Sequence, residues 1–159
     1  MKLLRTFSKT AFLLSLLIVA TLVACKDDDE PQPTEDKDPI IGTWQVVSIT
    51  PEAAGTTIPE LALIPTIAPC ITSLKLTFNA DNSLTTKDCD VAVTFIGAFV
   101  PINAGSRWKV DGNKLTLSNG NTSKDFNYTR TDTELKVVVN TNTDATKPAV
   151  NAVLTFKRV

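Results

Sequence analysis

The chain has 159 residues and a formal net charge of −1, from 16 basic and 17 acidic side chains, and it has no histidine. Its basic residues form no stripe that could neutralise a phosphate backbone, so we expect no nucleic-acid partner. Without histidine the chain lacks Ser–His and Cys–His nucleophile pairs and the commonest transition-metal ligand, so we expect no enzyme, no metal site and no cofactor.

Residues 1–24 have the three-part form of a secretory signal peptide. The segment begins with the basic residues Lys2, Arg5 and Lys9, contains no acid, and continues as an apolar run. This run is too short to cross about 30 Å of hydrocarbon comfortably. We therefore predict that the chain is exported and cut before Cys25.

The signal peptide is followed by a cysteine in the sequence LVAC, whose last residue is Cys25. This sequence resembles the lipobox of bacterial lipoproteins, in which the cysteine sulfur receives a diacylglycerol. The resemblance implies a membrane anchor on Cys25, since each buried acyl methylene contributes about 0.8 kcal/mol of membrane affinity.

The sequence KDDDE over residues 26–30 resembles the export signal of surface lipoproteins in the Bacteroidetes. That resemblance implies a position on the outside of the outer membrane. The alternatives are an ordinary solvated linker and a domain on the periplasmic leaflet. Prolines among like charges cannot bury enough apolar area to fold, so residues 25–39 are predicted to form a disordered, extended linker.

The remaining residues, 40–159, are predicted to form one all-β domain, because short stretches of alternating apolar and polar residues are separated by turn residues. No helical periodicity long enough for a real helix is present after the signal peptide. Eight or nine strands joined by hairpins favour an antiparallel up-and-down barrel, with a β-sandwich as the alternative. The predicted strands cover residues 41–49, 73–78, 83–86, 91–95, 107–110, 114–118, 124–130, 134–139 and 150–157.

The first predicted strand begins with Gly42, Thr43 and Trp44, which resemble the Gly-x-Trp motif of lipocalin-type barrels. Together with the order of strands, turns and cysteines, this makes residues 40–159 similar to the lipocalin-like domains of Bacteroidetes lipoproteins. The resemblance implies that Trp44 closes the floor of the barrel. It also implies that Arg158 packs over Trp44 in a cation–π contact worth about 0.5–2 kcal/mol.

Two cysteines remain inside the domain, Cys70 and Cys89. In the oxidising compartment that an exported protein reaches, we predict that they form a disulfide. Closing a loop of about 20 residues contributes about 3 kcal/mol in the chain-entropy model. A redox or metal pair is the alternative, but the spacing is not Cys-x-x-Cys.

Two apolar loops are the candidates for binding. The first loop covers residues 50–69, where four prolines forbid a long helix and leave room for a single turn over residues 59–63. The second is a predicted flap over residues 96–102. If both loops lie at one open end, they line an entrance or a partner-binding patch; otherwise they fill the barrel as core. The candidate residues are Ile58, Leu61, Leu63, Ile64, Ile67, Phe95, Phe99 and Trp108.

These features predict a surface-anchored barrel that binds a small apolar ligand or a partner protein. Burial of ligand surface among Trp44, Trp108, Phe78 and Phe95, at about 25 cal/mol per Å², would supply the affinity. The alternative is an assembly lipoprotein whose loops dock onto an outer-membrane protein complex without any small ligand. The acid pairs Asp88 with Asp90 and Glu52 with Glu60 are interpreted as solvated loop charges.

Overall fold

The computed structural model describes residues 38–142, 144 and 146–159. The predicted signal peptide, the predicted lipidation site Cys25 and most of the predicted linker lie outside these residues. In the described part of the chain, no helix is long and apolar enough to cross a membrane.

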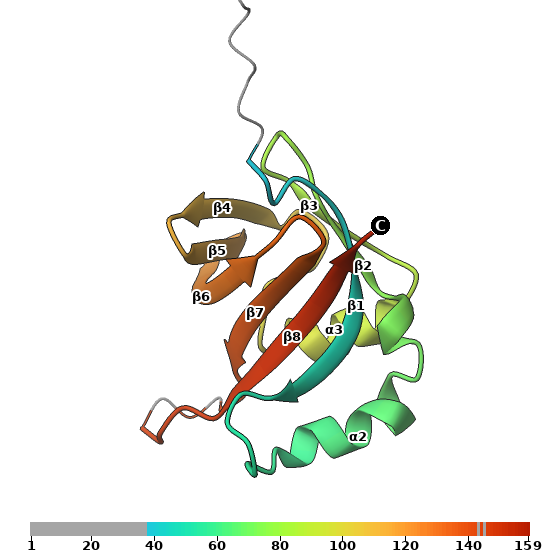
Figure 1. Ribbon diagram of the computed structural model, residues 1–159, viewed down its shortest axis with the longest axis vertical. Coiled ribbons are helices and arrows are strands. Elements are labelled where there is room, and N and C mark those ends of the chain that lie inside the picture. The colour runs from blue at the N-terminus through green and yellow to red at the C-terminus, as the bar shows by residue number, and fades with distance from the viewer. Residues whose placement is uncertain (1–37, 143, 145) are drawn as a thin grey trace, which may run out of the picture. The chain divides into compact units, whose positions relative to one another are not determined.

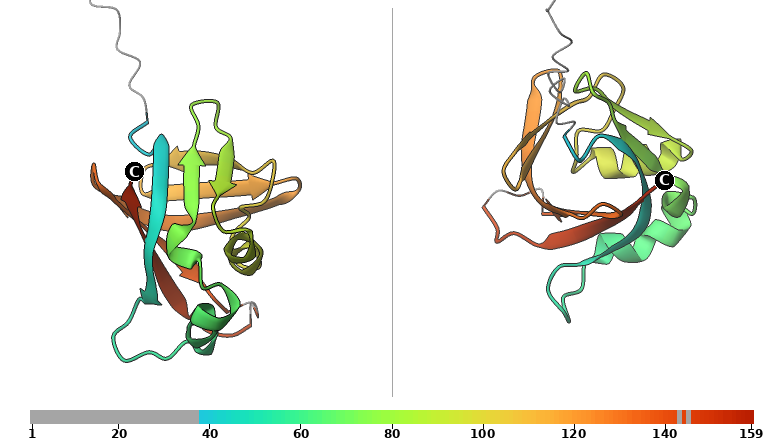
Figure 2. Two further views of the ribbon diagram at one scale, coloured as in Figure 1. Left: turned by 90° about the vertical axis from the view of Figure 1, so that its right-hand side faces the viewer. Right: turned by 45° about the horizontal axis from the view of Figure 1, so that its top comes forward.

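Eight antiparallel strands form a nearly closed barrel, as the strand pattern predicts (Figures 1 and 2). Each strand is hydrogen-bonded to its neighbours in the order β3-β2-β1-β8-β7-β6-β5-β4. The first and last strands of the domain therefore lie side by side. The strands are β1 (Gly42–Pro51), β2 (Lys75–Phe78), β3 (Leu84–Lys87), β4 (Arg107–Asp111), β5 (Lys114–Asn119), β6 (Thr122–Arg130), β7 (Glu134–Asn140) and β8 (Asn151–Arg158).

A short contact between the turn before β3 and the start of β4 closes the ring. Ser83 and Arg107 form an isolated antiparallel bridge. On either side of it, the amide of Leu84 donates to the carbonyl of Ser106 and the amide of Trp108 donates to the carbonyl of Asn82, both at 2.9 Å. These bonds satisfy backbone groups that would otherwise form a free sheet edge. The architecture is thus an up-and-down barrel and not a β-sandwich.

The alternation of residue types explains why these segments are strands. In β7, Leu135, Val137 and Val139 are buried, while the residues between them are half-buried or exposed. Since successive side chains of a strand point to opposite faces, this pattern places one apolar row inside the barrel. The tight turn between β4 and β5 uses Gly112, whose φ of +59° lies in the left-handed region that glycine adopts without strain.

The predicted strand over residues 91–95 is wrong: this segment lies in helix α3 (Asp90–Gly97). Val91, Val93 and Phe95 alternate in sequence, but the buried residues of the helix are Ala92 and Ile96, four positions apart. Burial of that helical face against the barrel overrides the strand preference of β-branched residues, which depends strongly on context.

The connection after β1 also holds more helix than predicted. The single turn expected over residues 59–63 is the start of α2 (Pro59–Ile67), and the short 3₁₀ helix η1 (Ile71–Ser73) follows it. Pro59 occupies the first turn, where its missing amide costs nothing, whereas Pro65 lies inside the helix and removes one hydrogen bond. Ile64 is the one α2 residue that is buried. The helix is therefore weakly attached.

Candidate functional site

One end of the barrel is closed by Trp44 and Arg158. The Trp44 side chain is fully buried, and its indole Nε1 donates to the carbonyl oxygen of Ile40 at 2.8 Å. The guanidinium carbon of Arg158 lies 4.2 Å from the centre of the Trp44 ring, so the structure contains the cation–π contact that the family resemblance implies.

Arg158 also ties two separate segments to the end of β8 at this closed end. Its guanidinium donates to the carbonyl oxygens of Pro39 at 2.6 Å, Ile41 at 2.9 Å and Asp132 at 2.8 Å. Gly42 allows this approach, because a Cβ at that position would lie 2.7 Å from Nη1 of Arg158. The first described residues, which lead into β1, therefore lie at this closed end.

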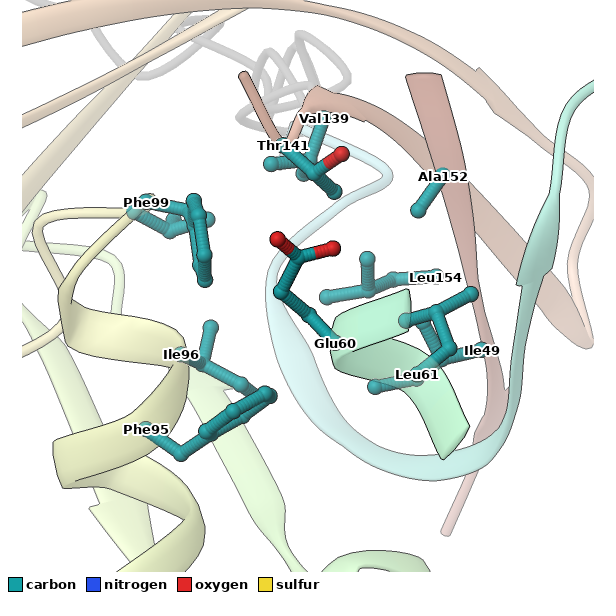
Figure 3. Close-up of a pocket in the computed structure, with 11 residues that line it drawn as sticks. Ile49, Glu60, Leu61, Phe95, Ile96, Phe99, Val139, Thr141, Ala152 and Leu154 are labelled. Carbon is teal, nitrogen blue, oxygen red and sulfur yellow. The ribbon is translucent and has the colours of Figure 1, made fainter. Parts of the chain in front are cut away.

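The opposite end carries the helices and a small apolar pocket (Figures 1 and 3). The pocket lies between α2, α3 and the ends of β1, β7 and β8, and its volume is about 30 Å³. This is room for about one water molecule. Its described lining consists of Ile49, Glu60, Leu61, Phe95, Ile96, Phe99, Val100, Val139, Thr141, Ala152 and Leu154.

A second cavity of about 20 Å³ lies deeper in the barrel and has only apolar side chains in its described lining. Ile96, Val100, Val139 and Leu154 line both cavities and so stand between them. Two of these, Ile96 and Val100, belong to α3 and the segment that follows it. Anything larger than a water molecule therefore reaches the barrel interior only if the helices shift.

A disulfide fixes the far end of α2 to the start of α3. Cys70 follows α2 and Cys89 precedes α3, and the two are bonded with a Cα–Cα distance of 5.7 Å. The cysteine pair predicted from the sequence is thus joined in the structure. The bond anchors α2 at its C-terminal side, whereas an exposed loop over residues 52–57 connects its N-terminal side to β1.

The sequence-predicted binding residues divide into three groups. Leu61, Phe95 and Phe99 line the pocket, and Phe95 packs edge-on against Phe99 with ring centres 6.2 Å apart. Ile58 and Ile64 are buried core. Leu63 and Ile67 are 51% and 43% exposed and do not belong to the pocket lining.

Trp108, the eighth candidate, is not at the pocket. It is buried in the core, where its ring meets Phe78 edge-on at 5.6 Å and its Nε1 donates to the carbonyl of Asn79 at 3.1 Å. Of the residues expected to surround a ligand, Phe95 lines the outer pocket, Phe78 lines the deeper cavity and Trp44 belongs to the closed end.

Sequence reasoning misses the strand residues of the pocket and the place of one acid. Ile49, Val139 and Ala152 come from three strands that are distant in sequence, and nothing in the alternation says which end of the barrel each reaches. Glu60 is interpreted from the sequence as a solvated loop charge; in the structure it is exposed but belongs to α2, and its carboxylate points toward the space between Phe99, Thr141 and Leu154 (Figure 3).

Asp88, which is next to a cysteine in the sequence, forms an ion pair at the surface. Its carboxylate accepts from Lys75 Nζ at 2.6 Å, and this hydrogen bond lowers the pKa of Asp88. Among the described residues no group of three or more His, Cys, Asp or Glu side chains is placed to hold a metal ion.

Comparison with known proteins identifies one family. A family model described as a lipocalin-like domain matches residues 40–137, which is more than half of the chain. The match runs from the residue that accepts the Trp44 hydrogen bond into β7. No curated protein and no solved structure gives a significant match.

Proposed function

Because this chain belongs to the lipocalin-like domain family, we propose that its barrel binds a small apolar ligand through the helix-covered end. The observation that carries the proposal is the pair of apolar cavities that lead from the gap between α2 and α3 into the barrel interior. The deeper cavity, whose described lining is wholly apolar, stays dry, and the apolar part of a ligand that replaces the side chains filling it gains contact area without losing hydrogen bonds.

Binding in this proposal requires α2 to move. The free volume in the structure fits about one water molecule in each cavity, so a ligand of useful size displaces helix residues. Helix α2 is the element that moves at least cost, since one of its residues is buried and two large apolar side chains are exposed. The exposed loop over residues 52–57 lets the N-terminal side swing away from the disulfide once buried Ile58 leaves the core.

A matched pair of variants on α2 tests ligand binding. Leu61 lines the pocket, whereas Leu63 on the same helix is 51% exposed and does not line it. With the uncharged fluorescent probe N-phenyl-1-naphthylamine, we expect saturable binding by the wild type and by Leu63→Asp. We expect at least about tenfold weaker binding by Leu61→Asp, because the ligand would bury an unpaired carboxylate.

Two results would contradict the ligand proposal. One is a wild-type protein that gives no saturable fluorescence increase. The other is an equal loss of binding in Leu61→Asp and Leu63→Asp, which would mean that the probe adheres to the exposed surface of α2.

We also propose that the domain is held at the outer membrane, at the cell surface, by lipid on Cys25, and acts without catalysis. The first described residues lie at the closed end, where the Arg158 guanidinium donates to the carbonyls of Pro39 and Ile41. The helix-covered end lies at the other end of the strands, so the first described residues lie away from the pocket.

Mass spectrometry of the membrane fraction tests the anchor. We expect the mature chain to begin at Cys25 and to carry a thioether-linked diacylglycerol, and we expect Cys25→Ser to lose this mass and its stable membrane association. An unmodified Cys25 sulfur, or a mature chain that retains residues 1–24, would refute this part of the proposal.

A partner protein is the second candidate for the bound species. The exposed apolar side chains of Leu63 and Ile67 favour it, because large apolar groups on one short surface helix are typical of interaction sites. The variants above separate the two candidates. If a protein partner binds this surface, Leu63→Asp should abolish partner binding and leave probe binding intact.

A further inference from the structure

The pocket at the helix-covered end has one carboxylate at its rim, that of the exposed residue Glu60, beside apolar walls. Glu60 is the second residue of α2, and Figure 3 shows its carboxylate pointing into the pocket, with Phe99 on one side and Leu154 and Ala152 on the other. Pro59 fixes the first turn of the helix and so fixes the direction in which the next side chain leaves it.

Within the described residues this carboxylate has no counter-charge. The described lining of the pocket includes no lysine or arginine, and no side-chain hydrogen bond or ion pair of Glu60 occurs in that part of the chain. The other polar lining residue, Thr141, uses its hydroxyl to donate to the carbonyl of Val150 at 2.8 Å.

One cationic side chain contacts the segment after α3, but it binds a backbone carbonyl and not Glu60. Lys124 donates from Nζ to the carbonyl oxygen of Phe99 at 3.0 Å, and it lines a separate polar depression together with Asp125. Water therefore solvates the Glu60 carboxylate in the free protein. A ligand that fills the pocket covers part of that hydration and must replace it.

From this geometry, and resting on the ligand binding proposed above, we propose that the ligand is a cationic amphiphile. Its apolar chain enters the barrel between Leu61 and Phe99, and its ammonium head stays at the rim against the carboxylate of Glu60. A cationic head compensates the charge that ligand binding desolvates, whereas an anionic head is repelled and a neutral head leaves the charge unpaired. Glu60 is thus the residue that determines head-group specificity.

A series of ligands with one chain length and three head groups tests this. Dodecylamine, dodecanol and dodecanoate, each below its micelle concentration, displace N-phenyl-1-naphthylamine from the full chain at neutral pH and low salt. We expect the amine to bind roughly tenfold more tightly than the carboxylate, with the alcohol between them, since an exposed charge contributes modestly for each sign. Added salt should reduce this ratio.

Two substitutions that remove the same charge show where the preference arises. Glu60→Gln should reduce the amine-to-carboxylate ratio to about twofold or less. Glu52→Gln is the matched control, because Glu52 does not line the pocket and its Oε2 accepts from Asn151 Nδ2 at 2.8 Å, a hydrogen bond that glutamine can keep. It should leave the ratio close to that of the wild type.

The outcomes distinguish this inference from the function on which it rests. If none of the three compounds binds the wild type, ligand binding itself is refuted. If all three bind but dodecanoate binds at least as tightly as dodecylamine, or if Glu60→Gln and Glu52→Gln change the ratio equally, the barrel binds apolar chains and Glu60 does not select the head group.

Discussion

Replacing Trp44 by alanine is expected to lower the free energy of unfolding by about 4 kcal/mol, the cost typical of deleting a large buried aromatic side chain. Trp44 is fully buried, and its loss opens a cavity at the closed end of the barrel. It also removes the ring beneath Arg158 and the donor to the Ile40 carbonyl. Urea unfolding should show a midpoint lowered by about 2–4 M with an unchanged slope.

Trp44→Phe separates the parts of this effect. Phenylalanine keeps an aromatic face for the Arg158 guanidinium but cannot donate to the carbonyl oxygen of Ile40. We expect a loss of about 1–3 kcal/mol, chiefly from the buried carbonyl that loses its donor. Trp108 is then the only tryptophan left and reports unfolding by fluorescence. If Trp44→Ala costs less than about 1 kcal/mol, the closed end does not hold the barrel together.

The alternation of apolar and polar residues predicts most of the barrel strands, because a sheet with one buried face requires apolar side chains on that face and polar side chains on the other. The eight observed strands each overlap a predicted strand. The contact of Arg158 with Trp44 is the one that the resemblance to lipocalin-type barrels implies, and the two residues pair across β1 and β8. The tight hairpin at Gly112 is equally predictable, since a glycine next to Asp111 and Asn113, between two alternating strands, is typical of a short hairpin turn.

The alternation of residue types does not predict the helices, and the reason is physical. Val91, Val93 and Phe95 satisfy a strand period, and the helical period of Ala92, Ile96 and Val100 is visible only once the barrel that buries them is known. The length of α2 is hard to predict because four prolines dominate its surroundings, although Pro59 sits where a helix tolerates it.

The pocket is only half predictable. Leu61 and Phe99 are candidates because apolar side chains in the long predicted connections require a place to be buried, and Phe95 is a candidate as an aromatic residue expected to surround the ligand. Its strand residues have the same alternating character as any other core position, and only register and closure bring them to the helix-covered end. The direction of Glu60 depends on a helix that the sequence does not predict in full.

Removing the disulfide is the second large effect that we expect. Cys70→Ala with Cys89→Ala should lower the free energy of unfolding by about 3 kcal/mol, because the bond closes a loop in the unfolded chain across a sequence separation of 19 residues. A reducing agent should destabilise the wild type by a similar amount and leave the double variant unchanged. Equal stability of the oxidised wild type and the double variant would show that the bond is not formed or does not constrain the unfolded chain.

The same double variant examines how the pocket opens. In the oxidised protein α2 is fixed near its C-terminal end, so it swings about Cys70 and cannot leave the barrel end. Without the bond, buried Ile64 and Ile58, the residue directly before α2, still hold the helix down. We therefore expect N-phenyl-1-naphthylamine to associate several-fold faster with the double variant than with the wild type, since opening precedes binding. Association rates that stay equal while stability falls would mean that the ligand enters past α3 and that α2 is not the gate.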